Sequence, residues 1–484
     1  MSFQNIISKY KSLSIQVKAS LWFVICSILQ KGISVLTTPI FTRLLTPSEY
    51  GNYNVFNSWL GILTPIISLN LCAGVYSQAL VKFDEDRPRL SSSLQGLTII
   101  LLSFWTIVYF LNRNFWNSLL SLSTLQVLFM LGLIWTSSVF GFWSCSQRVA
   151  YKYKVLIIVT LIVAILKPLF GILFVIKADD KVMARIFAIF IVELMCYFWM
   201  FIYQTWKGKV LFSFKYWSYA IKFNLPLVPH YLSQTILNDA DRIMIKNMVG
   251  ESFAGIYSLA YSLAILMLLI NTAFMNVLSP WIYTKIKEKQ LNNVGKIGYA
   301  CLLIIALANL LLIIFAPELV MLFAPSEYYD AIWIIPPVAM SSFFVFLYDL
   351  FAKFEFYFEK TKFIMAASVF GAILNVILNY LFINIFGYMA AGYTTLICMI
   401  VYSIGHYCFM RIICNKYLDG IKVYNSKLIF MISFIFCSIG FLFMAFYNHL
   451  LIRMFFLIMC FIVFLVLRKK IVLLLSEYLK IIKR

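Results

Sequence analysis

Ionisable and amide side chains stand inside long apolar runs of this sequence, where a lipid-facing helix would carry leucine. The run that begins near Phe223 contains His230, Gln234, Asn238 and Asp241, spaced by four, four and three residues. An α-helix turns by about 100° per residue, so this spacing places all four side chains on one helix face. Ionisable groups at membrane depth are costly and usually face a bundle interior or a water-filled cavity. The stripe therefore predicts a polar cavity.

A second polar stripe lies near the start of the chain, where Ser27, Lys31, Ser34 and Thr38 are spaced by four, three and four residues. Lys31 lies about twelve residues into its apolar run, which is far for a lysine to reach the membrane surface. We interpret the two stripes as facing each other across a central cavity. The alternative is that Ser and Thr bond their own helix while Lys31 extends to the surface.

Further charges stand in the middle of apolar runs. Lys167 precedes Pro168, which must free a carbonyl group and bend its helix, and Glu193 lies in the next run, where it is able to neutralise Lys167. A structural pair and a coupling role both remain open. Asn375 and Asn379 form an i,i+4 pair in a later run. Protonation of Asp241, Glu193 or His230 is our hypothesis for how a carrier would be reset.

Two other charge pairs have simpler interpretations. Asp239 lies three residues before Arg242, so the two are candidates for an ion pair at the outer membrane boundary, although Arg242 is equally a candidate ligand. Asp349 and Lys353 are spaced as an i,i+4 pair at the inner boundary, which is typical of a helix end.

The composition excludes several classes of protein. The 484 residues are 63% apolar and 12% charged, far from the values of a soluble domain, so we expect an all-α polytopic membrane protein. The net charge of +21 is explained by Lys and Arg in cytoplasmic loops, not by nucleic-acid binding. The chain lacks the GxxxxGK[ST] motif of nucleotide-hydrolysing sites, and its ten cysteines and three histidines have no metal-site spacing. We expect no cofactor, no metal site and no covalent chemistry.

Helix count and sidedness follow from apolar length and charge. A span needs about 20 apolar residues, which predicts fourteen helices. They cover residues 19–42, 52–74, 92–112, 119–145, 154–177, 183–206, 220–245, 253–280, 297–316, 330–352, 362–385, 388–410, 427–447 and 450–468. With the N-terminus in the cytoplasm, the inner segments hold 30 of the 40 Lys and Arg residues and the outer connections hold 8, while Lys31 and Lys167 lie within the membrane. Both termini are therefore predicted to be cytoplasmic.

A faint internal repeat divides the chain. Ser48, Gly51, Tyr53 and Ser58 match residues at an offset of 204, and the segment 164–174 matches a later one at an offset of 208, which aligns Lys167 with Asn375. The predicted parts are a cytoplasmic segment 1–18, an N-lobe 19–206 of six helices, a linker 207–219, a C-lobe 220–415 of six helices, and two further helices with a basic tail in 416–484. Repeated lobes with a site between them recur among secondary transporters.

Three segments resemble the signatures of polysaccharide flippases. They are Thr42–Phe56 (TRLLTPSEYGNYNVF), Asp241-Arg242 followed by Gly255-Ile256-Tyr257-Ser258, and the run with Asn375, Asn379 and Gly387. In their order and spacing they are similar to O-antigen or capsule repeat-unit translocases (Wzx type) of the multidrug/oligosaccharidyl-lipid/polysaccharide exporter superfamily.

This resemblance implies two lobes that form a V-shaped central cavity and open alternately to either side of a bacterial inner membrane. The substrate would be a polyprenyl-diphosphate-linked oligosaccharide, moved to the outer leaflet. Because such cavities are cationic in the family, Lys31 and Lys167 are candidates to hold the diphosphate. A proton or a sodium ion would couple the cycle, and a polysaccharide polymerase is a candidate partner.

Three alternatives remain. A drug exporter of the same superfamily would need acidic cavity residues, whereas two of the deep charges here are lysines. A lipid II translocase is expected to carry basic clusters that are not apparent here. A glycan polymerase or ligase, which shares the lipid substrate, generally needs a large outer loop with catalytic Arg or His, and the predicted outer connections are short.

Overall fold

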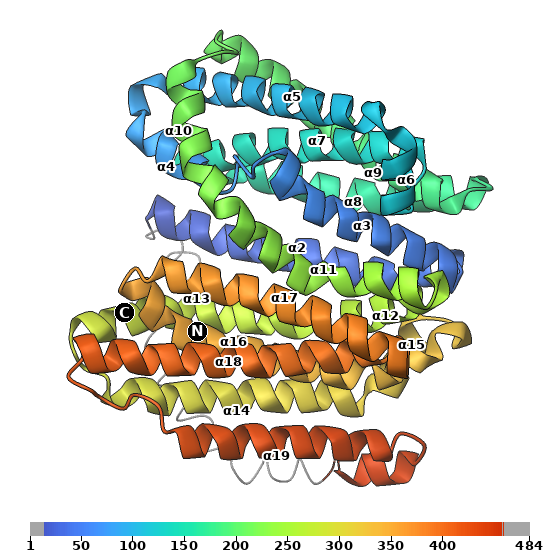
Figure 1. Ribbon diagram of the computed structural model, residues 1–484, viewed down its shortest axis with the longest axis vertical. Helices are drawn as coiled ribbons and strands as arrows, with labels where there is room; N and C mark the ends of the chain where they lie inside the picture. Colours follow the sequence, from blue (N-terminus) through green and yellow to red (C-terminus); the bar gives the residue numbers. More distant parts are fainter. Residues whose placement is uncertain (1–13, 457, 459–484) are drawn as a thin grey trace, which may run out of the picture. The chain divides into compact units, whose positions relative to one another are not determined.

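The structure, a computed structural model, describes residues 14–456 and residue 458. All regular elements of these residues are helices (Figure 1). Eleven of the helices are long and apolar enough to cross a membrane, which agrees with the predicted multi-pass membrane protein. The chain divides between Asp239 and Ala240 into two compact units, which are described separately.

The described part of the first unit holds nine α-helices, two short 3-10 helices and the first half of a tenth α-helix, joined by short turns. Its elements are α2 (Ile15–Leu44), α3 (Pro47–Ile67), α4 (Val75–Lys82), η1 (Asp84–Asp86), α5 (Arg87–Leu111), α6 (Arg113–Leu120), α7 (Thr124–Val149), α8 (Tyr153–Lys177), α9 (Lys181–Gly208), α10 (Phe214–Asn224), η2 (Leu225–Leu227) and the start of α11 (Val228–Met248). Helix α9 packs against α5, α7 and α8, and α2 packs against α8. Helix α9 is therefore the central helix of this unit, and α2 lies outside α8.

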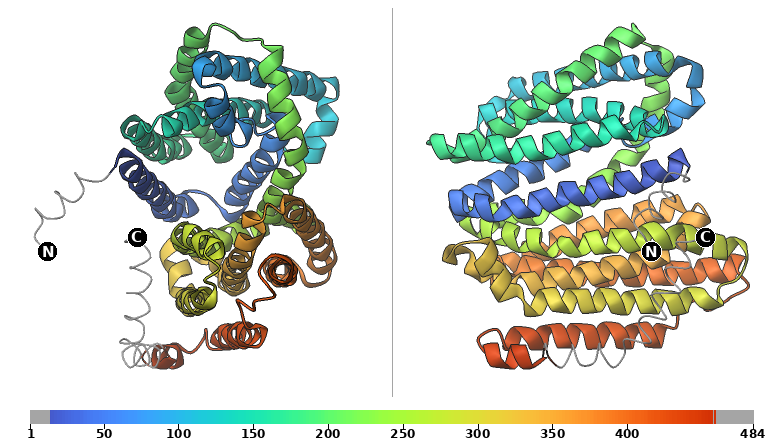
Figure 2. Two further views of the ribbon diagram at one scale, coloured as in Figure 1. Left: turned by 90° about the vertical axis from the view of Figure 1, so that its left-hand side faces the viewer. Right: turned by 180° about the vertical axis from the view of Figure 1, so that it is seen from behind.

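The second unit continues α11 and adds nine elements. They are α12 (Glu251–Ala264), α13 (Leu266–Lys287), α14 (Asn292–Ile314), α15 (Ala316–Phe323), η3 (Ser326–Trp333), α16 (Ile335–Tyr357), α17 (Thr361–Phe386), α18 (Ala390–Tyr417) and α19 (Ser426–Ala445). Helix α16 is the central one, because it packs against α12, α13, α14 and α18 and most of its side chains are buried. The end-on view of Figure 2 shows the helices of each unit gathered into a bundle.

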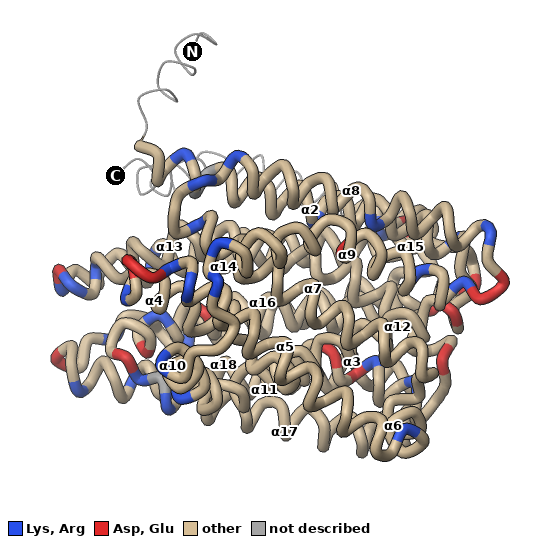
Figure 3. Tube along the Cα trace, turned by 90° about the horizontal axis from the view of Figure 1, so that it is seen from above, with Lys and Arg blue, Asp and Glu red and all other residues tan. Residues whose placement is uncertain are grey.

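Helices occupy thirteen of the fourteen predicted positions. The eleven apolar helices account for most of them, while α3 and α11, each of 21 residues, stand at the more polar positions 52–74 and 220–245. The last predicted span, 450–468, lies largely outside the described residues. Figure 3 shows that Lys, Arg, Asp and Glu gather toward the helix ends, as expected when the middle of each helix lies in hydrocarbon.

Three predicted helices have wrong boundaries, each for a local reason. The span 52–74 ends at Ile67, after which Leu69 and Asn70 take up left-handed backbone conformations that no helix continues. The span 220–245 is interrupted at η2, because Pro226 and Pro229 lack the N–H groups that a continuous helix requires. The span 253–280 consists of α12 and α13, which separate at Ile265.

The predicted linker 207–219 packs on the first unit. The indole Nε1 of Trp217 in α10 donates to the carbonyl oxygen of Ser93 at 2.8 Å, and the Tyr216 hydroxyl donates to Asp86 Oδ2 at 2.9 Å. An alanine Cβ at Gly96 of α5 would lie only 2.0 Å from the carbonyl oxygen of Leu211, so this approach requires glycine. The chain between α9 and α11 therefore covers α5.

Candidate functional site

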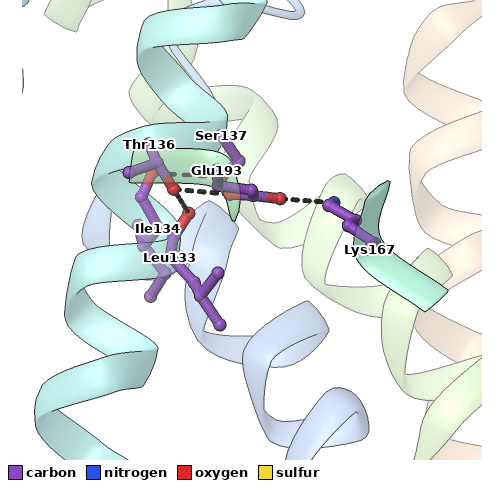
Figure 4. A network of polar contacts seen from close by, with 6 residues as sticks. All are labelled: Leu133, Ile134, Thr136, Ser137, Lys167 and Glu193. Carbon is purple, nitrogen blue, oxygen red and sulfur yellow. Dashed lines mark hydrogen bonds and ion pairs between the residues drawn. The ribbon is translucent and has the colours of Figure 1, made fainter. Parts of the chain in front are cut away.

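A buried polar network joins three helices of the first unit (Figure 4). Lys167 Nζ of α8 lies 2.6 Å from Glu193 Oε1 of α9, which confirms the predicted pairing of these residues. The second carboxylate oxygen, Oε2, accepts a hydrogen bond from the Thr136 hydroxyl of α7 at 2.5 Å. The Glu193 side chain is 9% exposed and that of Lys167 is 31% exposed. The carboxylate is thus enclosed, while the lysine reaches a more open space.

That space is a pocket of about 220 Å³ between α2, α8 and α9, with Tyr53 of α3 on its wall. It is lined by Gln30, Ile33, Ser34, Thr37, Phe41, Tyr53, Ala164, Lys167, Pro168, Arg185 and Ile189. Ala164 and Pro168 both lie on the pocket wall. Pro168 has no N–H, so the Ala164 carbonyl oxygen receives no helix hydrogen bond from it and can accept one from a ligand. The pocket therefore combines two cations with polar groups from α2.

Arg185 is the second cation on this wall. Its guanidinium carbon lies 3.5 Å from the ring centre of Tyr53 and 3.8 Å from that of Phe41, so both aromatic faces hold its plane. Among the described residues, Arg185 makes no ion pair, and its buried Nη1 has no hydrogen-bond partner. Since Glu193 neutralises Lys167, Arg185 supplies the uncompensated positive charge of the pocket.

The second unit holds a different cluster, centred on Asp241. This carboxylate is fully buried and accepts hydrogen bonds from the Tyr257 hydroxyl at 2.5 Å, Asn379 Nδ2 at 2.5 Å and the Thr395 hydroxyl at 2.9 Å. The Asn379 amide oxygen accepts from the Thr394 hydroxyl, and Asn379 Nδ2 also lies 3.2 Å from the amide oxygen of Asn375. Helices α11, α12, α17 and α18 thereby meet at one carboxylate.

Several predicted site residues are brought together, although not on a cavity wall. Asp241, Asn375 and Asn379 are all fully buried within the second unit. In this structure the helices of their own unit enclose them, and their predicted role at a cavity stays a prediction. Lys31 is exposed and does not line the pocket that contains Lys167. The two lysines thus occupy different environments.

Some side chains of the two polar stripes bond the backbone of their own helix, as the alternative to a cavity expects. The Ser27 hydroxyl donates to the carbonyl oxygen of Phe23 at 2.9 Å, and that of Thr38 donates to the carbonyl oxygen of Ser34 at 3.0 Å, both within α2. On α11, Asn238 Nδ2 donates to the Gln234 carbonyl oxygen at 2.7 Å.

The other polar residues of α11 have separate surroundings. His230 is half-buried, and its Nδ1 has no partner among the described residues. The guanidinium carbon of Arg242 lies 4.4 Å from the ring centre of Tyr261. The pairing of Asp239 with Arg242 and the cavity roles of His230 and Gln234 stay predictions.

Sequence reasoning missed Arg185 and one buried pair. Arg185 stands one turn inside α9, near enough to the membrane boundary to be counted as a loop charge. The carboxylate of Glu355 in α16 lies 2.8 Å from His406 Nδ1 in α18, and both side chains are almost fully buried. The available signal for this pair was one ionisable residue next to the predicted span 330–352 and one inside the span 388–410, with a further span between them. The predicted pair of Asp349 and Lys353 is confirmed at 2.6 Å.

A family model described as "Polysaccharide biosynthesis protein" matches residues 17–286, more than half of the chain. The chain belongs to this family. The family resemblance seen in the sequence is thereby confirmed. The "Lsg locus putative protein 1" of Haemophilus influenzae is 24% identical over 205 residues, which are 41% of this chain and 51% of that protein. The match thus spans about half the length of this relative.

Solved structures with a similar fold extend over most of the chain. The lipid II flippase MurJ, in an inward closed conformation, has a TM-score of 0.64 and 15% identity, covering 90% of this chain and all of MurJ. An inward-facing multidrug resistance transporter of the MATE family has a TM-score of 0.60 and 14% identity, covering 80% of this chain and 96% of its own. At these identities the likeness establishes the fold, which is that of the MOP superfamily to which the second structure belongs.

Proposed function

We propose that this chain flips a polyprenyl-diphosphate-linked oligosaccharide repeat unit from the cytoplasmic to the outer leaflet of a bacterial inner membrane. The product would serve O-antigen or capsule synthesis. Membership of the polysaccharide biosynthesis family and the fold shared with a lipid II flippase support this proposal. The observation that carries it is the pocket of the first unit, where Arg185 has no carboxylate partner among the described residues.

In this proposal the diphosphate binds to Arg185. A guanidinium group presents two parallel N–H donors that match the oxygens of a phosphate, and Tyr53 and Phe41 already hold its plane. Gln30, Ser34 and Thr37 on the same wall offer hydrogen bonds to sugar hydroxyls. The prenyl chain would remain in the lipid while the two lobes alternate between inward and outward openings.

Glu193 is our candidate for coupling within this pocket. While its carboxylate is ionised, it neutralises Lys167 at 2.6 Å. Protonation of Glu193 would remove that negative charge and leave the Lys167 ammonium facing the pocket, where it would attract the diphosphate. Substrate binding and proton binding would then strengthen each other, because linkage between two sites is reciprocal.

Asp241 is the candidate for a coupling ion in the second unit. Its carboxylate accepts hydrogen bonds from the hydroxyl groups of Tyr257 and Thr395 and from the amide nitrogen of Asn379, and a proton or a sodium ion on the carboxylate would replace some of them. Binding of that ion would change the contacts between α11, α12, α17 and α18, and so bias the alternation of the carrier.

The test is complementation of a flippase deletion strain, with surface glycan as the readout. We expect Arg185→Met to lower glycan display at least tenfold, because losing one charge-assisted contact of about 1.5–3 kcal/mol corresponds to a factor of ten or more. The matched control is Lys177→Met at the exposed C-terminal end of α8, outside the pocket, which should retain display. Both variants must be present in the membrane in equal amounts.

The same assay separates this function from the alternatives. Loss of a flippase leaves no glycan on the surface, whereas loss of a polymerase leaves single repeat units. Full display by Arg185→Met would contradict the role of this pocket. A chain that protects cells from cationic drugs and never restores display would contradict flipping altogether.

A further inference from the structure

A second basic pocket lies within the first unit, apart from the site already described. Its volume is about 180 Å³, and three cations lie around it: Arg87, Lys152 and Lys207. Its wall also includes Leu80, Pro88, Trp143, Gln147 and Tyr203. The wall thus offers both apolar or aromatic side chains and amide and hydroxyl groups.

The three cations come from separate helix ends. Arg87 is the first residue of α5, Lys152 directly precedes α8, and Lys207 stands in the last turn of α9. The predicted sidedness puts all three ends on the cytoplasmic side. Their convergence depends on Gly208, where an alanine Cβ would lie 2.2 Å from the carbonyl oxygen of Pro88. The close approach of α9 to α5 therefore builds the pocket.

The positive charge of this pocket is largely uncompensated. Arg87 pairs with Asp84 at 2.5 Å, but the aspartate side chain is 68% exposed and does not line the pocket. In the part of the chain that the structure describes, neither Lys152 nor Lys207 forms an ion pair, and Lys207 Nζ lies 3.4 Å from the hydroxyl and 5.6 Å from the ring centre of Tyr203. The general excess of Lys and Arg on the cytoplasmic side does not require these charges to meet at one pocket.

We propose that this pocket binds the phosphate group of a lipid at the cytoplasmic surface. Arg and Lys are the residues that bind phosphate oxygens, and basic pockets between membrane helices on the cytoplasmic side suit anionic head groups. The Gln147 amide is placed to donate to the same oxygens, while Trp143 and Leu80 offer apolar surface for the first carbons of the lipid. The phosphate belongs either to an anionic phospholipid or to a polyprenyl diphosphate.

The test is lipid retention by the purified full-length protein, measured by native mass spectrometry during titration. The probes are phosphatidylglycerol, phosphatidylcholine and a sugar-free polyprenyl diphosphate. The pocket variant carries Arg87→Gln, Lys152→Gln and Lys207→Gln. The control carries Arg89→Gln, Lys154→Gln and Lys209→Gln, which remove equal charge two residues away at the same helix ends, outside the pocket.

We expect the pocket variant to bind an anionic probe on the order of a hundredfold more weakly than the wild type, since each cation that lines the pocket contributes about fivefold to binding there. The control should lose less than tenfold. Selective loss of phosphatidylglycerol identifies a membrane phospholipid as the source, and selective loss of polyprenyl diphosphate identifies the lipid-linked substrate. Equal losses in the two variants, or no loss in either, would overturn the proposal.

A charge-preserving variant distinguishes loss of positive charge from disruption of the fold as the cause of weaker binding. Arg87→Lys combined with Lys152→Arg and Lys207→Arg keeps three cations in the pocket. It should retain binding within threefold of the wild type. If it loses binding as fully as the glutamine variant while the protein stays folded, positive charge is not what the pocket uses, and the proposal fails.

Discussion

Removing one member of the Lys167–Glu193 pair at a time should give unequal losses of stability. In Lys167→Met, the Glu193 carboxylate stays in a site where its side chain is 9% exposed, and the Thr136 hydroxyl is the one donor left to it among the described residues. In Glu193→Gln, the Lys167 ammonium remains 31% exposed on the wall of a pocket, where water reaches it. The enclosed anion therefore depends on its partner more than the cation does.

The expected magnitudes follow from this difference in burial. Breaking a fully buried ion pair costs about 3–5 kcal/mol, and solvent screening reduces the cost for an exposed member. Because the Thr136 hydrogen bond remains, we expect Lys167→Met to lower the free energy of unfolding by about 3 kcal/mol. We expect about 1 kcal/mol for Glu193→Gln, whose amide still accepts from Thr136.

The double variant Lys167→Met with Glu193→Gln decides whether the two residues act as a pair. It has neither an unpaired anion nor an unpaired cation, so its loss should be about 1 kcal/mol, well below the sum of the single losses. The measurement is denaturant-induced unfolding in mixed detergent micelles, followed by tryptophan fluorescence. Equal losses in the single variants that add up in the double variant would refute the reasoning. They would show that Thr136 and the surrounding helices support each group independently.

Three other predictions concern single side chains. Asp241→Asn turns an amide N–H toward one of three donors, so we expect a loss of about 2–3 kcal/mol in thermal denaturation. It should also abolish any dependence of glycan display on the proton or sodium gradient. Gly96→Ala places a methyl group against a backbone carbonyl and should lower the yield of folded protein, whereas Gly405→Ala, with no atom within 4 Å, should leave it unchanged or improved. Glu355→Gln removes the charge opposite His406 and should cost about 1–3 kcal/mol, read from the unfolding midpoint; an unchanged midpoint would contradict that pairing.

Most helix positions were predictable because a membrane span must form its backbone hydrogen bonds within itself and present apolar side chains over its full length. Interruptions within those runs were harder to predict. Pro226 and Pro229 indicate the break before α11, since each proline lacks the backbone N–H that a continuous helix needs. The break at Ile265 has no such residue, and it depends on tertiary packing that periodicity does not report.

The candidate site was predictable where a charge had to find a partner at membrane depth. Lys167 and Glu193 lie at similar depth on two helices joined by a short turn, so their pairing followed from the chain itself. Arg185 was missed because one turn inside a helix looks like a membrane boundary. Its value as a ligand comes from Phe41 and Tyr53, which reach it from other helices. Such contacts arise from packing and leave no spacing in the sequence.

The internal repeat predicted from the sequence would give these two sites a common origin. At the offsets of 204 and 208, Tyr53 aligns with Tyr257 and Lys167 aligns with Asn375, while Asp241 aligns with Thr37, which lines the pocket of the first unit.

Equivalent positions thus form a cationic pocket in one unit and a buried carboxylate cluster in the other. In the first unit the aligned tyrosine holds a guanidinium plane, and in the second it donates to Asp241. A carrier that must bind a diphosphate and also respond to a cation needs sites of opposite charge. Divergence of one ancestral helix set would supply both. On this reasoning Thr37→Asp should convert the first pocket toward the second and should abolish glycan display, because a carboxylate beside Arg185 would neutralise the free cation. Retained display in Thr37→Asp would show that the charge of this pocket does not select the substrate.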